Sequence, residues 1–199
     1  MRYRYLTIER EYGSGGTEIA KELSKELHIP CYGHEILELT CQRLGISETK
    51  IEKYEETVTN SFLFSVFMMS NTASGRSEGV AGEGQIYLAE QAVIRDLAAK
   101  GPAIFLGHCA SEALHGVQGV AGVFIRADKV YKKVRIQTEY GIDERNVEST
   151  RKYFDKKRAN YYYANTARRW DDLSGYDLVL DSGKLGAAGC LAALTGLMK

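Results

Sequence analysis

Residues 3–27 read YRYLTIEREYGSGGTEIAKELSKEL, and this stretch decides the fold. Residues 3–8 are rich in aromatic and branched side chains, which favours a short β-strand. From residue 17 onward, Ile19, Ala20, Leu23 and Leu27 recur with the spacing of one helical face. Residues 9–16 separate the two patterns and end in the glycine-rich stretch Gly-Ser-Gly-Gly. The sequence therefore predicts a strand, a tight glycine-rich turn and a helix.

A turn of this kind is suited to binding phosphate. Backbone N–H groups at the start of a helix face the ligand, and the helix dipole adds about half a positive charge there. Glycine lets the anion approach the main chain and permits positive φ angles. The residues expected to hold phosphate are Gly13, Ser14, Gly15, Gly16 and Thr17. The hydroxyl of Thr17 is also expected to bind Mg²⁺. A tight turn without a ligand is the alternative.

The turn departs from the standard phosphate-binding loop, G-x-x-x-x-G-K-[ST]. Aligned on Thr17, residues 10–17 read R-E-Y-G-S-G-G-T. Arg10 thus takes the place of the first glycine, and Gly16 takes the place of the lysine. That lysine normally reaches the β- and γ-phosphates of the nucleotide. Arg10 could supply the missing charge from the other end of the turn.

The rest of the chain alternates apolar strands with amphipathic helices. Strands are predicted at residues 102–106, 120–125 and 176–181, and helices at residues 34–44, 47–56, 85–99, 129–140, 146–165 and 185–198. Residues 71–84 are rich in Gly, Ser and Asn and predict a loop. The alternation predicts a single α/β domain over residues 1–199, with a parallel sheet between two layers of helices. A Rossmann-like sheet is the alternative, although the first turn lacks G-x-G-x-x-G.

The composition excludes several classes of function. The 26 basic and 26 acidic residues give no net charge, which provides no support for binding nucleic acid or an acidic membrane. No stretch approaches the roughly 20 apolar residues that span a bilayer. The four cysteines match no zinc-binding pattern, and the N-terminus lacks the apolar run of a secretion signal. We expect a cytoplasmic protein with free thiols and leave its oligomeric state open.

A basic segment lies near the C-terminus. Residues 151–169 contain seven basic residues and a single acid. Arg151, Asp155 and Arg158 are spaced i, i+4 and i+7, so they share one face of a helix. Two guanidinium groups on that face can bracket a transferring phosphoryl group, and the carboxylate can orient both. The alternative is a ladder of salt bridges on a solvated helix.

Aromatic residues follow this basic face. A helix cannot bury three consecutive rings on one side, so we expect some of Tyr161, Tyr162 and Tyr163 to pack beneath the helix and another to be exposed. For these rings and for Trp170, packing in the core is favoured over stacking on a nucleotide base.

Three segments together resemble the cytidylate kinase-like family, a branch of the P-loop nucleoside-monophosphate kinases. They are E-R-E-Y-G-S-G-G-T-E-I-A at residues 9–20, K-G-P-A-I-F-L-G-H-C-A at residues 100–110, and R-K-Y-F-D-K-K-R-A-N-Y-Y-Y at residues 151–163. The third is followed by Trp170 and by Y-D-L-V-L-D-S at residues 176–182. The resemblance covers nearly the whole chain. It implies a P-loop kinase fold with a helical acceptor-binding segment at about residues 31–84 and a lid at about residues 143–172.

The resemblance also implies a reaction. Such enzymes transfer the γ-phosphoryl group of ATP, with Mg²⁺, to a nucleoside monophosphate, here cytidylate or a related small phosphate acceptor. The implied catalytic residues are Arg10, Arg151, Asp155 and Arg158. Lys132 and Arg135 would flank the base and phosphates of ATP, and Thr17 would meet the metal. His34, Arg43 and His108 would bind the acceptor, although a surface position for Arg43 and neutral packing for both histidines are alternatives.

The chain differs from the family pattern at three further positions. Gly33 stands where family members commonly have Asp, and His108 stands where an arginine would grip the phosphate of the acceptor. Lys152 replaces the first aspartate of the lid motif R-D-x-x-D-x-x-R. These changes suggest an altered acceptor or weak activity. Two further hypotheses therefore stay open: a nucleotide-binding regulatory module without turnover, and a protein-interaction domain on an inherited scaffold.

Overall fold

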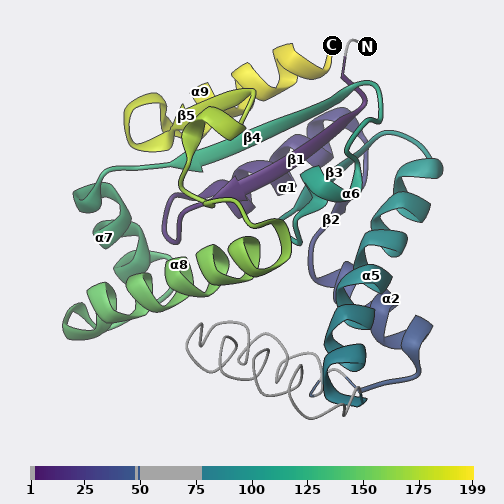
Figure 1. Ribbon diagram of the computed structural model, residues 1–199. Coiled ribbons are helices and arrows are strands. Elements are labelled where there is room, and N and C mark those ends of the chain that lie inside the picture. The colour runs from purple at the N-terminus through teal and green to yellow at the C-terminus, as the bar shows by residue number, and fades with distance from the viewer. Residues whose placement is uncertain (1–2, 48, 50–77) are drawn as a thin grey trace.

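The computed structural model describes residues 3–47, 49 and 78–199 (Figure 1). Its centre is a five-stranded sheet in the order β2-β3-β1-β4-β5, and every neighbouring pair of strands is parallel. The strands are β1 (Tyr5–Arg10), β2 (Cys31–Tyr32), β3 (Ala103–Leu106), β4 (Val120–Arg126) and β5 (Leu178–Asp181). The predicted parallel sheet is confirmed. The two-residue strand β2 was not predicted because so short a segment carries no periodicity.

Helices connect the strands. They are α1 (Gly16–Leu27), α2 (His34–Leu44), α5 (Glu78–Ala99), α6 (Ala110–Ala113), α7 (Lys129–Thr138), α8 (Glu144–Thr166) and α9 (Ser182–Met198), with a 3₁₀ turn at Leu173–Gly175. The helices predicted from residues 17, 34, 129 and 146 are confirmed within a few residues. The helix α9 is interrupted at Gly186, where φ is 67° and ψ is 169°.

One prediction of a loop is wrong in part. Residues 78–84 belong to α5, which begins seven residues before the predicted start at residue 85. Each glycine in this stretch lowers helix propensity by only about 1 kcal/mol, and a strong helix can extend cooperatively past such residues. Residues 71–77, and almost all of the helix predicted from Ser47, lie outside the described residues.

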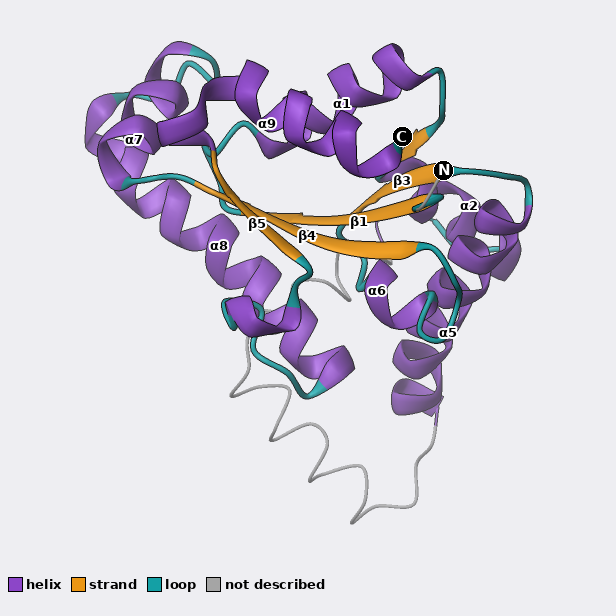
Figure 2. Ribbon diagram, turned by 90° about the horizontal axis from the view of Figure 1, so that it is seen from above, coloured by secondary structure: helices purple, strands orange, loops and turns teal. Residues whose placement is uncertain are grey.

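The sheet is covered on both faces. Figure 2 shows α1 and α9 over one face and α5, α6 and α8 over the other. On the first face, the buried side chains come from the central strands and from both helices, and they include Leu6, Ile8, Leu23, Ile125 and Leu194. All four residues of β3 are buried. This double burial explains why the strands are continuous apolar runs rather than alternating ones.

The second face has two clusters. One joins the sheet to α2, α5 and α6, and includes Ile36, Ile94 and Phe105. The other joins β4 to α8 through Phe124, Tyr162 and Trp170. Tyr162 and Trp170 are buried, whereas Tyr163 is 60% exposed, as expected for three consecutive tyrosines on a helix.

The parallel arrangement directs the carboxyl ends of the strands to one edge. The first strand lies between β3 and β4, so the chain leaves it at the point where the strand order reverses. Ligands of open α/β sheets bind at such a point. Helix α8 passes beside the loop that follows β1 (Figure 1). Within the described part of the chain, no helix combines the length and apolar character needed to cross a bilayer.

Candidate active site

The loop after β1 has the geometry expected of a phosphate-binding turn. Gly13 has a φ of 84° and Gly15 a φ of 78°, both in the left-handed region that favours glycine. The Ser14 hydroxyl donates to the Glu11 carbonyl at 2.8 Å and accepts from the Gly16 N–H at 3.3 Å. The helix α1 then starts at Gly16 without a side-chain cap. Because Ser14 takes the Gly16 N–H, the next amide groups, those of Thr17 and Glu18, are the ones available to an anion.

Arg10 fills the space beside Gly16. A Cβ atom at residue 16 would lie 2.7 Å from the Cβ of Arg10 and 3.3 Å from the Cβ of Ile125. The Arg10 Nε donates to the Thr17 hydroxyl at 3.3 Å. Its Nη1 would lie 3.0 Å from a Cβ at Gly107. A side chain at residue 16 would clash with the Cβ of Arg10. The arginine at residue 10 and the glycine at residue 16 therefore depend on each other.

The basic face of α8 meets this loop. The Asp155 carboxylate accepts from the backbone N–H of Tyr12 at 2.7 Å and from Arg151 Nη1 at 3.1 Å. Arg158 Nη1 donates to the carbonyl of Arg10 at 3.0 Å and lies 3.8 Å from the Asp155 carboxylate. Arg151, Asp155 and Arg158 therefore share one face, as their spacing predicts, and this face is docked on the loop.

Aromatic contacts add to the docking. The ring of Tyr12 stacks on Phe154, with centroids 4.5 Å apart and planes 11° from parallel. Tyr140 lies on Tyr12 at 5.3 Å, and the guanidinium carbon of Arg158 lies 5.8 Å from the centre of the same ring. Such ring and cation–π contacts each contribute roughly 0.5–1.5 kcal/mol.

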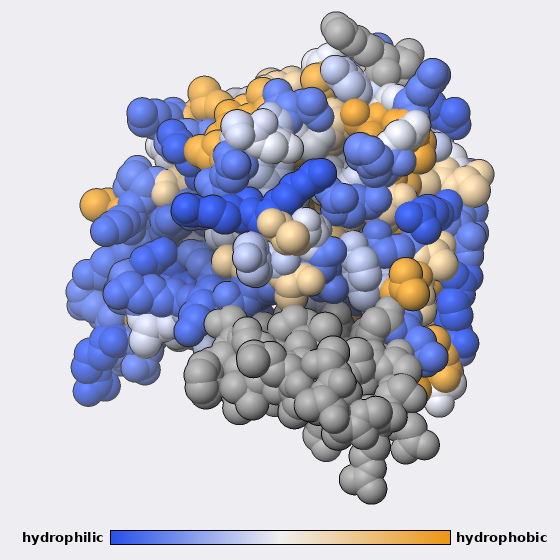
Figure 3. Space-filling view, in the orientation of Figure 1, coloured by the Kyte–Doolittle hydropathy of each residue, from blue (hydrophilic) through white to orange (hydrophobic). Residues whose placement is uncertain are grey.

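Two cavities adjoin at this contact. The loop cavity, of about 250 Å³, is lined by Arg10, Glu11, Tyr12, Gly13, Gly15, Gly16, Thr17, Glu18, Tyr140 and Arg158. The inner cavity, of about 190 Å³, is lined by Glu9, Arg10, Leu106, Gly107, His108, Phe154, Lys157, Arg158, Tyr161 and Tyr162. Both linings include Arg10 and Arg158, so these two cations stand at the junction. Figure 3 shows hydrophilic side chains gathered over α7 and α8 beside it.

The electrostatics of the junction favour an anion. Burial, with a further contribution from the nearby charge of Arg10, lowers the pKa of Arg158 to about 10. Arg158 therefore remains a cation at neutral pH, but one whose charge is poorly compensated. Burial also raises the pKa of Asp155, against the opposing effects of the Tyr12 N–H and Arg158. An oxyanion between the two guanidinium groups would relieve their repulsion.

One buried carboxylate lines the inner cavity, and a second contacts two of the residues that line it. Glu9, at the end of β1, accepts from the Trp170 indole N–H at 3.0 Å. Glu90, on α5, accepts from the Tyr161 hydroxyl, and its other oxygen lies 3.5 Å from His108 Nδ1. His108 thus reaches the inner cavity, where the resemblance placed an acceptor-binding residue.

Lys132 and Arg135 are separated by the structure. Lys132 is buried, and its ammonium group bonds the Glu11 carboxylate at 2.7 Å, which fixes the start of the loop. It lies outside the linings of both cavities. Arg135 borders the loop on the α7 side, since a Cβ at Gly15 would lie 3.2 Å from its guanidinium carbon. Arg135 also lies outside both linings and pairs with Glu18 at 3.7 Å, so the structure brings neither residue into the two cavities.

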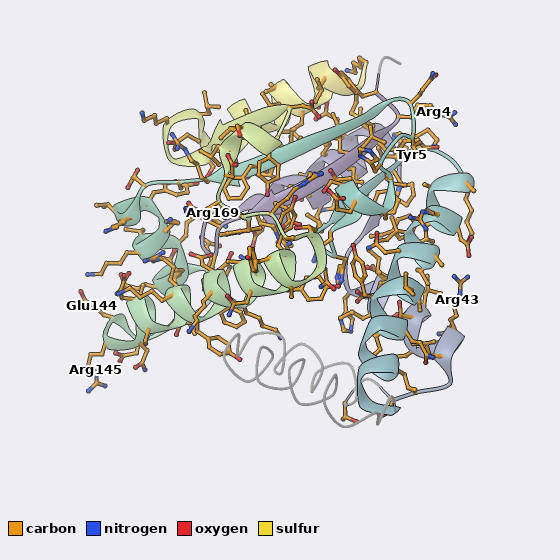
Figure 4. The ribbon with its side chains drawn as sticks, viewed as in Figure 1. Arg4, Tyr5, Arg43, Glu144, Arg145 and Arg169 are labelled. Atoms are coloured by element: carbon orange, nitrogen blue, oxygen red, sulfur yellow. The ribbon has the colours of Figure 1, made fainter. Side chains whose placement is uncertain are left out.

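His34 and Arg43 are not brought to the inner cavity. Helix α2 packs its Ile36, Thr40 and Cys41 side inward, which leaves both predicted residues on its other side. His34 Nε2 lies 3.6 Å from a Glu38 carboxylate, and Arg43 pairs with Asp96 of α5. Figure 4 shows Arg43 on α2, far from α8.

Gly33 leaves space beside the inner cavity. A Cβ at this position would lie 3.5 Å from the Cβ of Leu106, which is ordinary van der Waals contact. Leu106 lines the inner cavity. Packing therefore leaves room for a Cβ atom at residue 33.

Sequence reasoning missed the two buried carboxylates. Glu90 had a detectable signal, because it occupies a core-facing position between Ile86 and Val93 of an amphipathic helix. Glu9 also had one, since it ends an apolar strand beside the glycine-rich turn. Lys157 and Tyr161 lacked a distinguishing signal, because only the docking of α8 selects them from their neighbours.

The candidate site offers few protein ligands for a metal ion. Among the described residues, no three His, Cys, Asp or Glu side chains come close enough together to hold a metal ion. Mg²⁺ bound with nucleotide takes only one or two protein ligands beside phosphate oxygens and water. The Thr17 hydroxyl, which borders the loop cavity, fits this requirement.

The loop, the parallel sheet and the docked basic helix define a P-loop kinase fold, and solved structures agree. A crystal structure of an uncharacterized protein from Eubacterium ventriosum has a TM-score of 0.70 at 24% sequence identity, over 98% of this chain and 97% of that chain. Shikimate kinase from Bacteroides thetaiotaomicron has a TM-score of 0.52 at 11% identity, over 98% and 97%. TT1252 from Thermus thermophilus has a TM-score of 0.54 at 12% identity, over 100% and 97%.

The sequence assigns the chain to one family within this fold. The profile of the cytidylate kinase-like family matches residues 5–184, and the chain belongs to this family. The search of curated proteins returned no match to the sequence. Family and fold together support phosphoryl transfer to a small acceptor.

Proposed function

We propose that the protein transfers the γ-phosphoryl group of ATP to a small anionic acceptor. The family makes a nucleoside monophosphate of the cytidylate type, or a related small phosphate compound, the first acceptor to test. The observation that carries the proposal is the position of Arg10 and Arg158, which line both the loop cavity and the inner cavity. A phosphoryl group passing from one cavity to the other would pass between these two cations.

On the donor side, the loop would hold the phosphates of ATP. Its glycines and the first turn of α1 would supply N–H donors, and Arg10 would take the role of the missing lysine. Thr17 would bind Mg²⁺, which supplies charge stabilisation to the phosphate oxygens. Arg135, beside Gly15, would stand at the far side of the nucleotide phosphates.

On the acceptor side, Lys157 and Arg158 would attract an anionic group into the inner cavity. Asp155 would orient Arg158 and Arg151 on the face that meets the loop. Arg151 also bonds Glu148 at 2.8 Å, so in the docked state it serves as a support for Asp155. We further propose a single domain in the cytoplasm, consistent with the free thiols of all four cysteines.

The experiment is phosphoryl transfer measured with pure protein, Mg-ATP and a panel of nucleoside monophosphates. Arg10→Ala and Arg158→Ala are each expected to lower turnover about 100-fold, the usual effect of losing one group that stabilises transition-state charge. Arg145→Ala is the matched control, because this α8 side chain is 87% exposed and points away from the site (Figure 4). Equal activity of all three variants would contradict the proposal.

A second candidate function is a nucleotide-binding regulatory module without turnover. Two observations favour it: Arg158 is already bonded to the loop carbonyl, and Gly33 leaves the inner cavity without an expected carboxylate. Calorimetric binding of Mg-ATP with no product from any acceptor would support this function. Measurable phosphoryl transfer would eliminate it.

A further inference from the structure

The turn that carries His108 is strained. Gly107, His108 and Cys109 follow one another with φ angles of 73°, 56° and 50°. Non-glycine residues in this left-handed region cost roughly 1–2 kcal/mol each, and such strain persists where the surroundings over-determine it. Here Gln91 donates to the His108 carbonyl at 3.3 Å, and Arg10 packs against Gly107. The strained turn therefore delivers the His108 ring beside the proposed path of the phosphoryl group.

A buried carboxylate orients this ring. Glu90 is 1% exposed, and its Oε1 lies 3.5 Å from His108 Nδ1. Its Oε2 is held by the Tyr161 hydroxyl. The His108 side chain is 15% exposed and lines the inner cavity. The Nδ1 edge of the imidazole thus lies beside a fixed carboxylate, and the residue lines the inner cavity. A carboxylate at Nδ1 prepares the other nitrogen to accept a proton.

We propose that His108 is a general base, that Glu90 is its positioning residue, and that the group phosphorylated is a hydroxyl of a small anionic molecule. The inference rests on the proposed function, because it uses ATP as the donor. The hydroxyl oxygen forms a bond to the γ-phosphorus, and the bond from that phosphorus to the ADP oxygen breaks with both electrons leaving on ADP. The hydroxyl proton passes to His108 Nε2. The resulting imidazolium is stabilised by Glu90, and its proton later returns to water.

The chemistry of the acceptor explains why a histidine suits this position. A phosphate oxygen is already ionised near neutral pH, so its attack needs a cation to hold it rather than a base. A hydroxyl group must lose its proton as it attacks, and a base then contributes about 10²–10⁴-fold. The family's arginine fits the first case, and the His108–Glu90 pair fits the second. Lys157 and Arg158, in the same cavity, account for the anionic character of the acceptor.

The test compares His108→Gly with His108→Arg. Glycine suits a φ of 56°, so the first variant is expected to fold, and it leaves space for free imidazole. His115→Gly is the control, because His115 is exposed and lies outside both cavities. Water serves as the simplest hydroxyl acceptor through ADP release from Mg-ATP, with shikimate as a larger, anionic one and cytidine monophosphate as the phosphate acceptor. ³¹P NMR distinguishes a phosphate ester from a diphosphate product.

The wild-type protein is expected to form phosphate esters or to release ADP. His108→Gly should lose at least about 100-fold of this rate and recover part of it with added imidazole, which a purely structural role would not allow. Glu90→Gln should lower kcat far more than it changes KM. Retention of the rate in His108→Gly, or an unchanged rate of phosphate-ester formation in His108→Arg, would overturn the inference while leaving phosphoryl transfer intact. Failure of the wild-type protein to bind Mg-ATP would instead overturn the proposed function itself.

Discussion

Arg10 and Gly16 are expected to behave as a coupled pair. In Gly16→Ala the new Cβ would lie 2.7 Å from the Cβ of Arg10, well inside the 3.5–4.0 Å separation of non-bonded carbon atoms. The Cβ of Ile125, at 3.3 Å, blocks retreat to the other side. Overpacking of this kind costs about 1–3 kcal/mol. Alanine is favoured over glycine in a helix by about 1 kcal/mol, which offsets part of the loss.

The expected net loss of stability is therefore about 0–2 kcal/mol, or at most about 8 °C in the unfolding temperature of a domain of this size. Gly196→Ala is the control, because this glycine is also helical and its Cβ would meet nothing within 4 Å. Thermal denaturation followed by circular dichroism measures both. The control should be neutral or slightly stabilising.

The second step of the test restores the standard motif. Arg10→Gly together with Gly16→Lys changes residues 10–17 to G-E-Y-G-S-G-K-T, which satisfies G-x-x-x-x-G-K-[ST]. Each single change is expected to lose phosphoryl transfer, and the double variant should recover it. A coupling energy of about 1–3 kcal/mol should appear in the stability cycle. Strictly additive effects on stability, with no recovery of transfer, would refute the steric reasoning.

Three further predictions follow from the contacts of the site. Burial raises the pKa of Asp155 in the native state, so the stability of the fold falls as pH rises from about 4 through that raised pKa. Asp155→Asn should therefore unfold at a higher temperature than the wild type at pH 7. This gain should shrink as the pH is lowered towards 4. A lower unfolding temperature for the variant at pH 7 would show that the ion pairs outweigh burial. Trp170→Phe leaves the buried Glu9 without its donor and should cost about 1–3 kcal/mol in urea unfolding, whereas Tyr163→Phe on the surface should cost almost nothing. Millimolar inorganic phosphate should raise the unfolding temperature of the wild-type protein but not of Arg158→Met, and an equal rise in both would place the bound anion elsewhere.

Much of the fold could be predicted because its signals are local. The strand, turn and helix of residues 3–27 are each visible in side-chain spacing, and so are the later buried strands and most helices. The start of α5 could not be placed, because glycine-rich sequence is compatible with both a loop and a helix. The strand β2 exists only through its pairing with β3, a contact between distant parts of the chain.

The candidate site likewise has parts that could be predicted from short segments and parts that could not. The loop and the spacing of Arg151, Asp155 and Arg158 were predictable, because both follow from short segments. The inner cavity was not, since β1, the turn after β3, α5 and α8 all contribute to its surroundings. Lys132 shows why such contacts cannot be predicted from a short segment. This basic residue lies on the expected helix, but its ammonium group bonds Glu11, an acid 121 positions earlier in the chain.

On the loop's side, the helix α8 is held by main-chain atoms, which substitutions other than proline at residue 12 leave in place. Asp155 receives the amide of residue 12, and Arg158 donates to the carbonyl of residue 10, so neither bond depends on which side chains those residues carry. The side chain at residue 10 could therefore be exchanged during evolution without undoing this attachment. A family built in this way has a physical route away from the common motif while the loop and the helix stay in register.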